Sequence, residues 1–161
     1  MEISRRRIAF LADHPAFVHT LADWFRSEWS EYYADRTHAD IAQELSQDLN
    51  RDHIPIRLVA LEGGELTGCI VLRQIVLSTQ PDYSPGLGGL FVHARYRRRG
   101  IATELVRAGM SLARDLGYPV IYTTTNTARG IVERLGWERL ATVVHHGEEL
   151  GLYKRQLKVN E

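Results

Sequence analysis

The most informative segment of the sequence is Leu90-Phe91-Val92-His93-Ala94-Arg95-Tyr96-Arg97-Arg98-Arg99-Gly100-Ile101-Ala102. It begins as an apolar run typical of a buried strand, continues as an arginine-rich loop and ends where a helix is predicted to start. The first turn of a helix presents unpaired backbone N–H groups, and Gly100 places no side chain in front of them. Arginine side chains add bidentate hydrogen bonds to phosphate oxygens. The junction therefore predicts an anion site, and a pyrophosphate suits the amides of residues 98–103.

Other phosphate-binding motifs do not occur in the sequence. No Gly-x-Gly-x-x-Gly opens a predicted helix and no glycine-rich loop ends in Gly-Lys-Ser/Thr, so a dinucleotide or a nucleoside triphosphate is disfavoured. A solvated basic loop is the plain alternative. Binding of RNA or DNA is also disfavoured, because the loop lacks interleaved aromatic residues and the chain balances 20 Lys+Arg against 20 Asp+Glu.

Composition indicates an ordinary globular chain. With 161 residues, 44% of them hydrophobic and 25% charged, we expect one domain over residues 1–161. No apolar run approaches the roughly 18 to 20 residues that a membrane span needs, so no membrane partner is expected. The single cysteine, Cys69, lies in an apolar predicted strand and is interpreted as a buried hydrophobe in a cytoplasmic protein. The seven histidines are too scattered to predict a metal site.

Upstream of the arginine loop, strands and helices are predicted from their start and stop signals. A strand over 8–11 precedes a helix that Asp13 caps, with Pro15 near its first turn. Thr37 and Asp40 have the spacing of a capping box and open a second helix. A hairpin then joins 56–61 to 66–76 across two glycines, and 78–86 is predicted to be a loop before a strand over 87–92.

Downstream, apolar residues share one face of a predicted helix over 101–116. A β-branched strand over 120–125 and a short helix over 128–135 follow. The chain closes with a hairpin of 139–144 and 150–157, whose edge strand a second copy can cover. A homodimer is therefore one expected assembly.

These residues resemble the GNAT superfamily of N-acetyltransferases. Arg97-Arg98-Arg99-Gly100-Ile101-Ala102 is similar to its acyl-CoA loop, Arg/Gln-x-x-Gly-x-Gly/Ala. Asn126-Thr127-Ala128-Arg129-Gly130-Ile131-Val132-Glu133-Arg134-Leu135-Gly136-Trp137 is similar to its second signature, which ends in Tyr-Glu-Lys-Leu-Gly-Phe. The resemblance covers about residues 56–157. It implies an α/β (α+β) domain with a mixed, mostly antiparallel sheet of about seven strands, helices on both faces and a splay between strands 4 and 5.

The resemblance also implies a reaction: transfer of an acetyl group from acetyl-CoA, as cosubstrate, to a primary amine by direct attack in a ternary complex, without a metal. Backbone N–H groups near Leu90 and Phe91 would then polarise the acetyl carbonyl. Asn126 would face the cofactor or the substrate amide. The implied contacts to acetyl-CoA are Leu90, Phe91, Val92, Arg97, Arg98, Arg99, Gly100, Ile101, Ala102, Thr103, Asn126 and Arg129.

Two departures from the family concern proton transfer. Val132 stands where many relatives have a tyrosine that protonates the leaving thiolate, and Gly88 and Gly89 stand where many have an acidic base. Water or another side chain would have to serve, and the candidate acids are Tyr122, Tyr153 and His145. The candidate bases are Glu28, Glu31 and Asp35. The same departures motivate the rival hypothesis of a non-catalytic acyl-CoA-binding or regulatory module.

Trp29, Tyr32 and Tyr33 cluster where the first predicted helix ends, and they form either an edge of the core or a wall of the acceptor site. We expect acceptor specificity to come from this cluster, from the loop over 78–86 and from the turn over 145–149. Small-molecule amines and peptide amines both remain open as acceptors.

Overall fold

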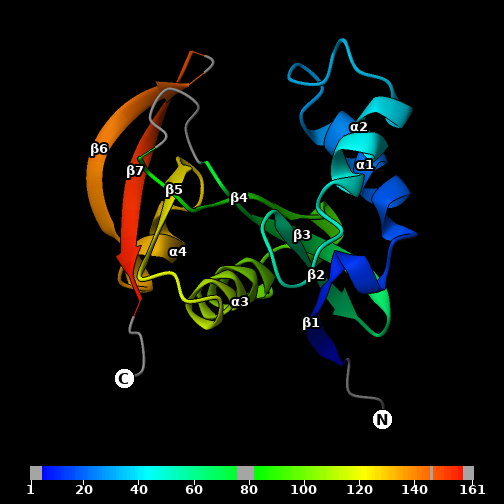
Figure 1. Ribbon diagram of the computed structural model, residues 1–161. Coiled ribbons are helices and arrows are strands. Elements are labelled where there is room, and N and C mark those ends of the chain that lie inside the picture. The colour runs from blue at the N-terminus through cyan, green and yellow to red at the C-terminus, as the bar shows by residue number, and fades with distance from the viewer. Residues whose placement is uncertain (1–4, 76–81, 146, 158–161) are drawn as a thin grey trace.

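The computed structural model describes residues 5–75, 82–145 and 147–157, and a seven-stranded sheet runs through its centre (Figure 1). The strands are β1 (Arg6–Phe10), β2 (Ile56–Glu62), β3 (Glu65–Arg73), β4 (Gly86–Val92), β5 (Val120–Thr125), β6 (Glu138–His145) and β7 (Glu148–Gln156). The helices are α1 (Phe17–Glu28), α2 (His38–Ser46), α3 (Ile101–Asp115) and α4 (Arg129–Arg134), with short 3-10 helices η1 (Leu11–Asp13) and η2 (Ala94–Tyr96).

The sheet order is β1-β2-β3-β4-β5-β7-β6. In the described residues β4 and β5 run parallel to each other, and the other neighbouring strands are antiparallel. Within the described residues these two strands are in register at one position, Gly86 with Tyr122. The Thr123 hydroxyl donates to the Leu87 carbonyl at 2.6 Å beside it. Beyond this point β4 and β5 diverge, and α3 packs against β3 and β4 (Figure 1). The expected seven strands, helices on both faces and splay are therefore confirmed.

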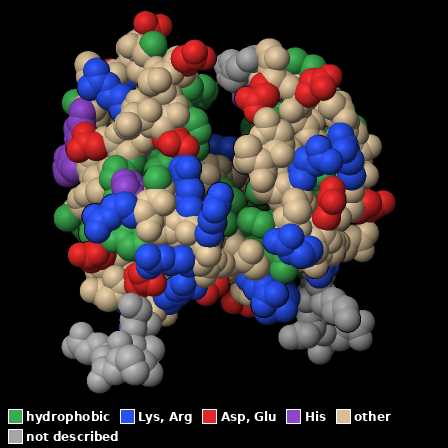
Figure 2. Space-filling view, turned by 180° about the vertical axis from the view of Figure 1, so that it is seen from behind, with side chains coloured by type: hydrophobic (Ala, Val, Ile, Leu, Met, Phe, Trp, Pro, Cys, Tyr) green, Lys and Arg blue, Asp and Glu red, His purple; other side chains and the backbone are tan. Residues whose placement is uncertain are grey.

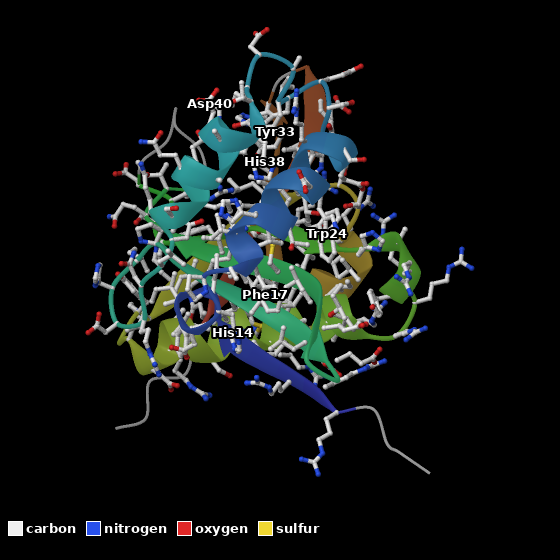
Figure 3. The ribbon with its side chains drawn as sticks, turned by 90° about the vertical axis from the view of Figure 1, so that its right-hand side faces the viewer. His14, Phe17, Trp24, Tyr33, His38 and Asp40 are labelled. Atoms are coloured by element: carbon white, nitrogen blue, oxygen red, sulfur yellow. The ribbon has the colours of Figure 1, made fainter. Side chains whose placement is uncertain are left out.

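Helices cover both faces of the sheet because β2 and β3 bury side chains on each side. Val59 and Leu61 contact the layer formed by α1 and α2, whereas Leu58 and Ala60 belong to the core beside α3. Burial on both faces explains why these strands are continuous apolar runs in the sequence. Figure 3 looks onto the α1–α2 layer, with Phe17 and Trp24 along α1 and Tyr33 beyond its end.

A β-bulge interrupts β4 close to the splay. Cys69 pairs with Phe91 and Val71 pairs with Gly88, so Gly89 and Leu90 together lie opposite one residue of β3. Gly89 has a φ of 60°, which a residue without Cβ adopts without strain. Bulges of this kind leave one residue out of the ladder and re-aim the backbone next to functional sites.

The structure confirms most of the predicted elements and corrects one helix start. The capping box of Thr37 and Asp40 is present, with N–H donation in both directions. The prediction that Asp13 caps α1 is wrong: α1 begins after Ala16 without a side-chain cap, and Asp13 instead accepts from Arg51 at 2.8 Å. β3 ends at Arg73, before its predicted end at Val76, which together with 77–81 lies outside the described residues. No helix in the described part of the chain has the length and apolarity to cross a membrane.

Candidate active site

The loop after β4 reaches α3 through backbone conformations that expose its amides. Arg98 has a φ of 66° and Gly100 a φ of 82°. Gly100 is the N-cap of α3, and apart from its chain neighbours no described atom lies within 4 Å of the position that a Cβ would take. A ligand can therefore approach the N–H groups of the first helical turn, where the helix dipole favours an anion.

The three consecutive arginines of this loop differ in their partners. Arg97 donates to Glu28 of α1 at 3.0 Å, and Arg99 donates to Glu62 of β2 at 3.0 Å. Arg98 makes no side-chain hydrogen bond to any residue that the structure describes. Basic side chains gather on this face of the molecule (Figure 2). Arg98 is therefore the arginine whose guanidinium is available to an incoming anion.

A cavity of about 220 Å³ lies between β4 and β5 where the strands part. Its walls include residues 88–90 of β4 and 123–126 at the end of β5, closed off by Val106, Val132 and Trp137. The indole Nε1 of Trp137 is buried and has no hydrogen-bond partner among the described residues. We call this space the inter-strand cavity.

A second, larger cavity of about 900 Å³ lies between the end of α1 and the β6–β7 hairpin. Trp29 and Leu150 line both cavities, so the two spaces meet at these side chains. Figure 2 shows the molecule hollowed between these two parts. We call this second space the α1–hairpin cavity. A ligand in either cavity can therefore reach the region around Trp29 and Leu150.

A side-chain hydrogen bond links a residue of one cavity to a residue of the other. Asn126, at the end of β5, lines the inter-strand cavity, and its amide Nδ2 donates to the carboxylate of Glu148. Glu148 lines the α1–hairpin cavity. A carboxylate able to accept a proton therefore stands at the boundary between the spaces.

The sequence profile described as the "Acetyltransferase (GNAT) family" matches residues 18–137. The chain belongs to this family. No curated protein sequence matches it. It shares the GNAT fold with solved structures at low identity, among them a GNAT acetyltransferase from Streptococcus pneumoniae, which is 15% identical with a TM-score of 0.71 and coverage of 96% of this chain and 100% of that one.

Two further GNAT-fold structures were solved with a ligand. An aminoglycoside 6'-N-acetyltransferase complexed with coenzyme A is 19% identical, with a TM-score of 0.74 and coverage of 93% of this chain and 96% of that one. A Salmonella typhimurium protein solved with acetyl-CoA is 18% identical, with a TM-score of 0.62 and coverage of 97% and 95%. At these identities the likeness establishes the fold alone.

The predicted cofactor contacts lie around the first turn of α3 and along β4. Leu90 lines the inter-strand cavity, whereas the Phe91 side chain is buried on the opposite face, 5.6 Å from the Trp29 ring centroid. Ile101 is also buried, so it can offer only its backbone to a ligand. Arg129 is exposed at the start of α4.

The structure places Asn126 and the three candidate acids in different surroundings. Asn126 and His145 line the inter-strand and α1–hairpin cavities respectively. Tyr153 lines neither: it is fully buried and its hydroxyl donates to Glu133 at 2.8 Å. Burial, followed by the hydrogen bond to Glu133, raises the pKa of Tyr153. Tyr122 also lies outside both cavities, with its ring 5.2 Å from that of Tyr83.

The aromatic cluster predicted at the end of α1 serves both packing and the cavity. Trp29 packs against Phe25 at 5.0 Å between centroids, yet it lines both cavities. Tyr32 and Tyr33 line the α1–hairpin cavity. Among the predicted bases, Glu28 and Glu31 also line this cavity, and Asp35 does not.

A buried polar network lies behind the β4 bulge. Arg57 donates to Asp48 at 2.9 Å and to the Cys69 sulfur at 3.4 Å, and the Cys69 thiol points to the Gly89 carbonyl at 3.8 Å. Burial raises the pKa of the Cys69 thiol, although the Arg57 cation opposes this shift. A protonated, buried thiol that lines neither cavity is a packing residue, as its sequence context predicts.

Three charged residues of the α1–hairpin cavity, Arg36, Arg73 and Glu148, were not predicted from the sequence. Glu148 lies in the turn that was expected to flank the acceptor, so its position was anticipated although its role was not. Arg73 ends the apolar run of β3, and a charged residue at that place in a buried strand is a signal that could have been followed. In the described residues no group of three or more His, Cys, Asp or Glu side chains is placed to hold a metal ion.

Proposed function

We propose that this GNAT protein transfers an acetyl group from acetyl-CoA to a primary amine by direct attack in a ternary complex. The observation that carries the proposal is the meeting of two cavities at Trp29 and Leu150, one between the diverging strands β4 and β5 and the other open toward α1 and the β6–β7 hairpin. Two substrates entering from different sides would meet there without exchanging places. Such an arrangement favours direct transfer over a covalent acyl-enzyme.

The residues of the inter-strand cavity and the α3 N-terminus suit acetyl-CoA. The amides of residues 101–103, with Gly100 leaving their approach open, would bind pyrophosphate oxygens, and Arg98 would add charge. The backbone of β4 beside the bulge would pair with the amide-bearing arm of the cofactor. Trp137 offers an unpaired N–H in the cavity wall. Neighbouring structures with coenzyme A and acetyl-CoA support this assignment.

Three groups of this chain would act on the reaction. The N–H groups at Leu90 and Phe91, re-aimed by the bulge, would stabilise negative charge on the acetyl oxygen. Glu148, held by Asn126, would accept a proton from the incoming ammonium. The leaving thiolate needs little assistance, because a free thiol has a pKa of about 8.5, and water or His145 would supply its proton.

Calorimetric titration with acetyl-CoA, followed by thiol release against a panel of primary amines in the same preparation, tests the proposal. Binding together with release for one class of amine would support it. Binding without release for any amine would favour the rival hypothesis of a non-catalytic acyl-CoA-binding module, which Val132 in the cavity wall motivates. Absence of binding would overturn the assignment of residues 97–103.

A further inference from the structure

Resting on the proposed function, we propose that the acceptor amine also carries a carboxylate, and that Arg73 binds this carboxylate. The acceptor is thus an amino-acid-like molecule, zwitterionic before it reacts.

Arg73 lies at the boundary between the two cavities. It is the last residue of β3 and pairs with Gly86 of β4. Its guanidinium extends along β4, because Nη2 lies 2.5 Å from the position that a Cβ on Gly88 would occupy. Gly88 lines the inter-strand cavity, whereas Arg73 lines the α1–hairpin cavity. Glycine at position 88 therefore makes room for a cation next to the place where the two substrates meet.

The charge of Arg73 is not neutralised within the described residues. Its neighbours Arg36 and Arg57 pair with Glu44 and Asp48 respectively. No hydrogen bond or ion pair joins Arg73 to any residue of 5–75, 82–145 or 147–157, and the sequence of 76–81 contains no acidic residue. An unpaired guanidinium in a concave site is a strong binder of anions.

The surroundings of Arg73 disfavour an isolated charge. Burial and the positive charge of Arg57 lower the pKa of the Arg73 guanidinium. The side chain is nevertheless accessible through the cavity. An anion entering the α1–hairpin cavity would remove this penalty, so the site favours an anionic ligand over water.

Two carboxylates of the same cavity, Glu31 and Glu148, select the rest of the acceptor. Both would attract the ammonium form of an amine, and Glu148 is the residue proposed to deprotonate it. One unpaired cation beside two carboxylates matches a monoanion better than a dianionic phosphate, which Glu31 and Glu148 would repel. A carboxylate and an ammonium on one small molecule satisfy all three groups.

The test compares matched amines on three proteins. Thiol release is measured with four amines that share one side chain: an α-amino acid, its amide, the decarboxylated amine and the aminophosphonic acid. Each amine is assayed with wild type, Arg73→Gln and Arg107→Gln. Arg107 is exposed on α3 and lines neither cavity, which makes it the matched control. We expect wild type and Arg107→Gln to prefer the amino acid over its amide by about 10- to 100-fold in kcat/KM, and Arg73→Gln to lose that preference, mostly through KM.

Several outcomes separate this inference from the function on which it rests. Three outcomes would overturn the inference and leave the acetyltransferase proposal intact. They are turnover with no preference for a carboxylate, a carboxylate preference that Arg73→Gln retains, and a preference for the aminophosphonic acid. If acetyl-CoA binds but no amine reacts, the CoA complex is titrated with the N-acetyl amino acid. Arg73→Gln should weaken the binding of this product at least tenfold, and equal binding to wild type and Arg73→Gln would overturn the inference. A protein that binds no acetyl-CoA would remove both proposals.

Discussion

Arg97 connects the loop before α3 to helix α1 through an ion pair with Glu28, residues 69 positions apart in the sequence. Its Nη2 donates to Glu28 at 3.0 Å, while its Nε donates to the Val92 carbonyl at 2.9 Å. The position of the loop is thereby tied to the helix that carries Trp29 into both cavities. The pair also occupies Glu28, one of the three bases predicted from the sequence.

Replacing Arg97 with alanine should weaken acetyl-CoA binding by about 1 to 3 kcal/mol, because the loop loses a cation and two charge-assisted hydrogen bonds. Titration calorimetry measures the change. Arg107→Ala, on the exposed side of α3, serves as the control and should leave the affinity unaltered. An affinity for Arg97→Ala equal to that of wild type would mean that the loop holds its shape and binds without this arginine.

Gly100→Val should lower the affinity for acetyl-CoA at least tenfold, because a branched Cβ would cover the amides of the first turn of α3. Gly117→Val provides a control at the other end of the same helix. Both glycines have left-handed φ values, 82° and 93°, and open space around the Cβ position. Each variant should therefore lose about 1 to 2 kcal/mol of unfolding free energy, while only the first loses binding. Equal losses of binding would trace the effect to the fold.

The buried ion pair between Arg57 and Asp48 should be costly to break. Asp48→Asn leaves the Arg57 guanidinium uncompensated in the interior, so we expect a loss of about 3 to 5 kcal/mol in unfolding free energy by urea titration. The double variant Asp48→Leu with Arg57→Met should recover most of this loss, because apolar pairs of similar volume substitute well for buried charges. A single variant within about 1 kcal/mol of wild type would contradict this expectation.

The capping box of α2 should make part of the stability acid-sensitive. Hydrogen bonds from the backbone N–H and then the hydroxyl of Thr37 lower the pKa of Asp40 below its ordinary value of 3.8. A depressed pKa in the folded state gives stability that is complete above the ordinary value and is lost as the pH falls through the folded value. The Tm of Asp40→Asn at pH 7 should therefore be lower than that of wild type, and the difference in Tm should shrink below about pH 4. A difference independent of pH would refute this origin.

Local signals predicted the fold well because they depend on neighbours in the chain. The helix predicted over 101–116 is found at Ile101–Asp115, since its apolar stripe and the following Gly117 act within a few residues. The start of α1 failed for the opposite reason. Asp13 has the type and place of a cap, but Arg51, 38 positions away, binds its carboxylate instead.

The candidate site could be predicted only where one segment builds it. The Arg97–Gly100 loop is such a segment, and its position before α3 follows from the sequence. The contact of Arg73 with Gly88 depends on the register between β3 and β4 and on the bulge at Gly89, neither of which a single sequence specifies. Tyr153 shows the converse: its chemistry suits a proton donor, yet strand alternation turns its side chain into the core.

The two cavities are lined by largely different stretches of the sequence. Apart from Trp29, Ile70 and Leu150, the inter-strand cavity draws on the contiguous stretch 87–137, whereas the other cavity draws on 28–36, Arg73 and the hairpin around 145–150. Residues that would choose the amine therefore flank those that would hold the cofactor and hardly overlap with them. A library randomised only at 30–36 and His145 should therefore change which amine the proposed reaction accepts and leave unaltered the residues proposed to hold acetyl-CoA, which makes this scaffold suited to laboratory evolution of new acceptors.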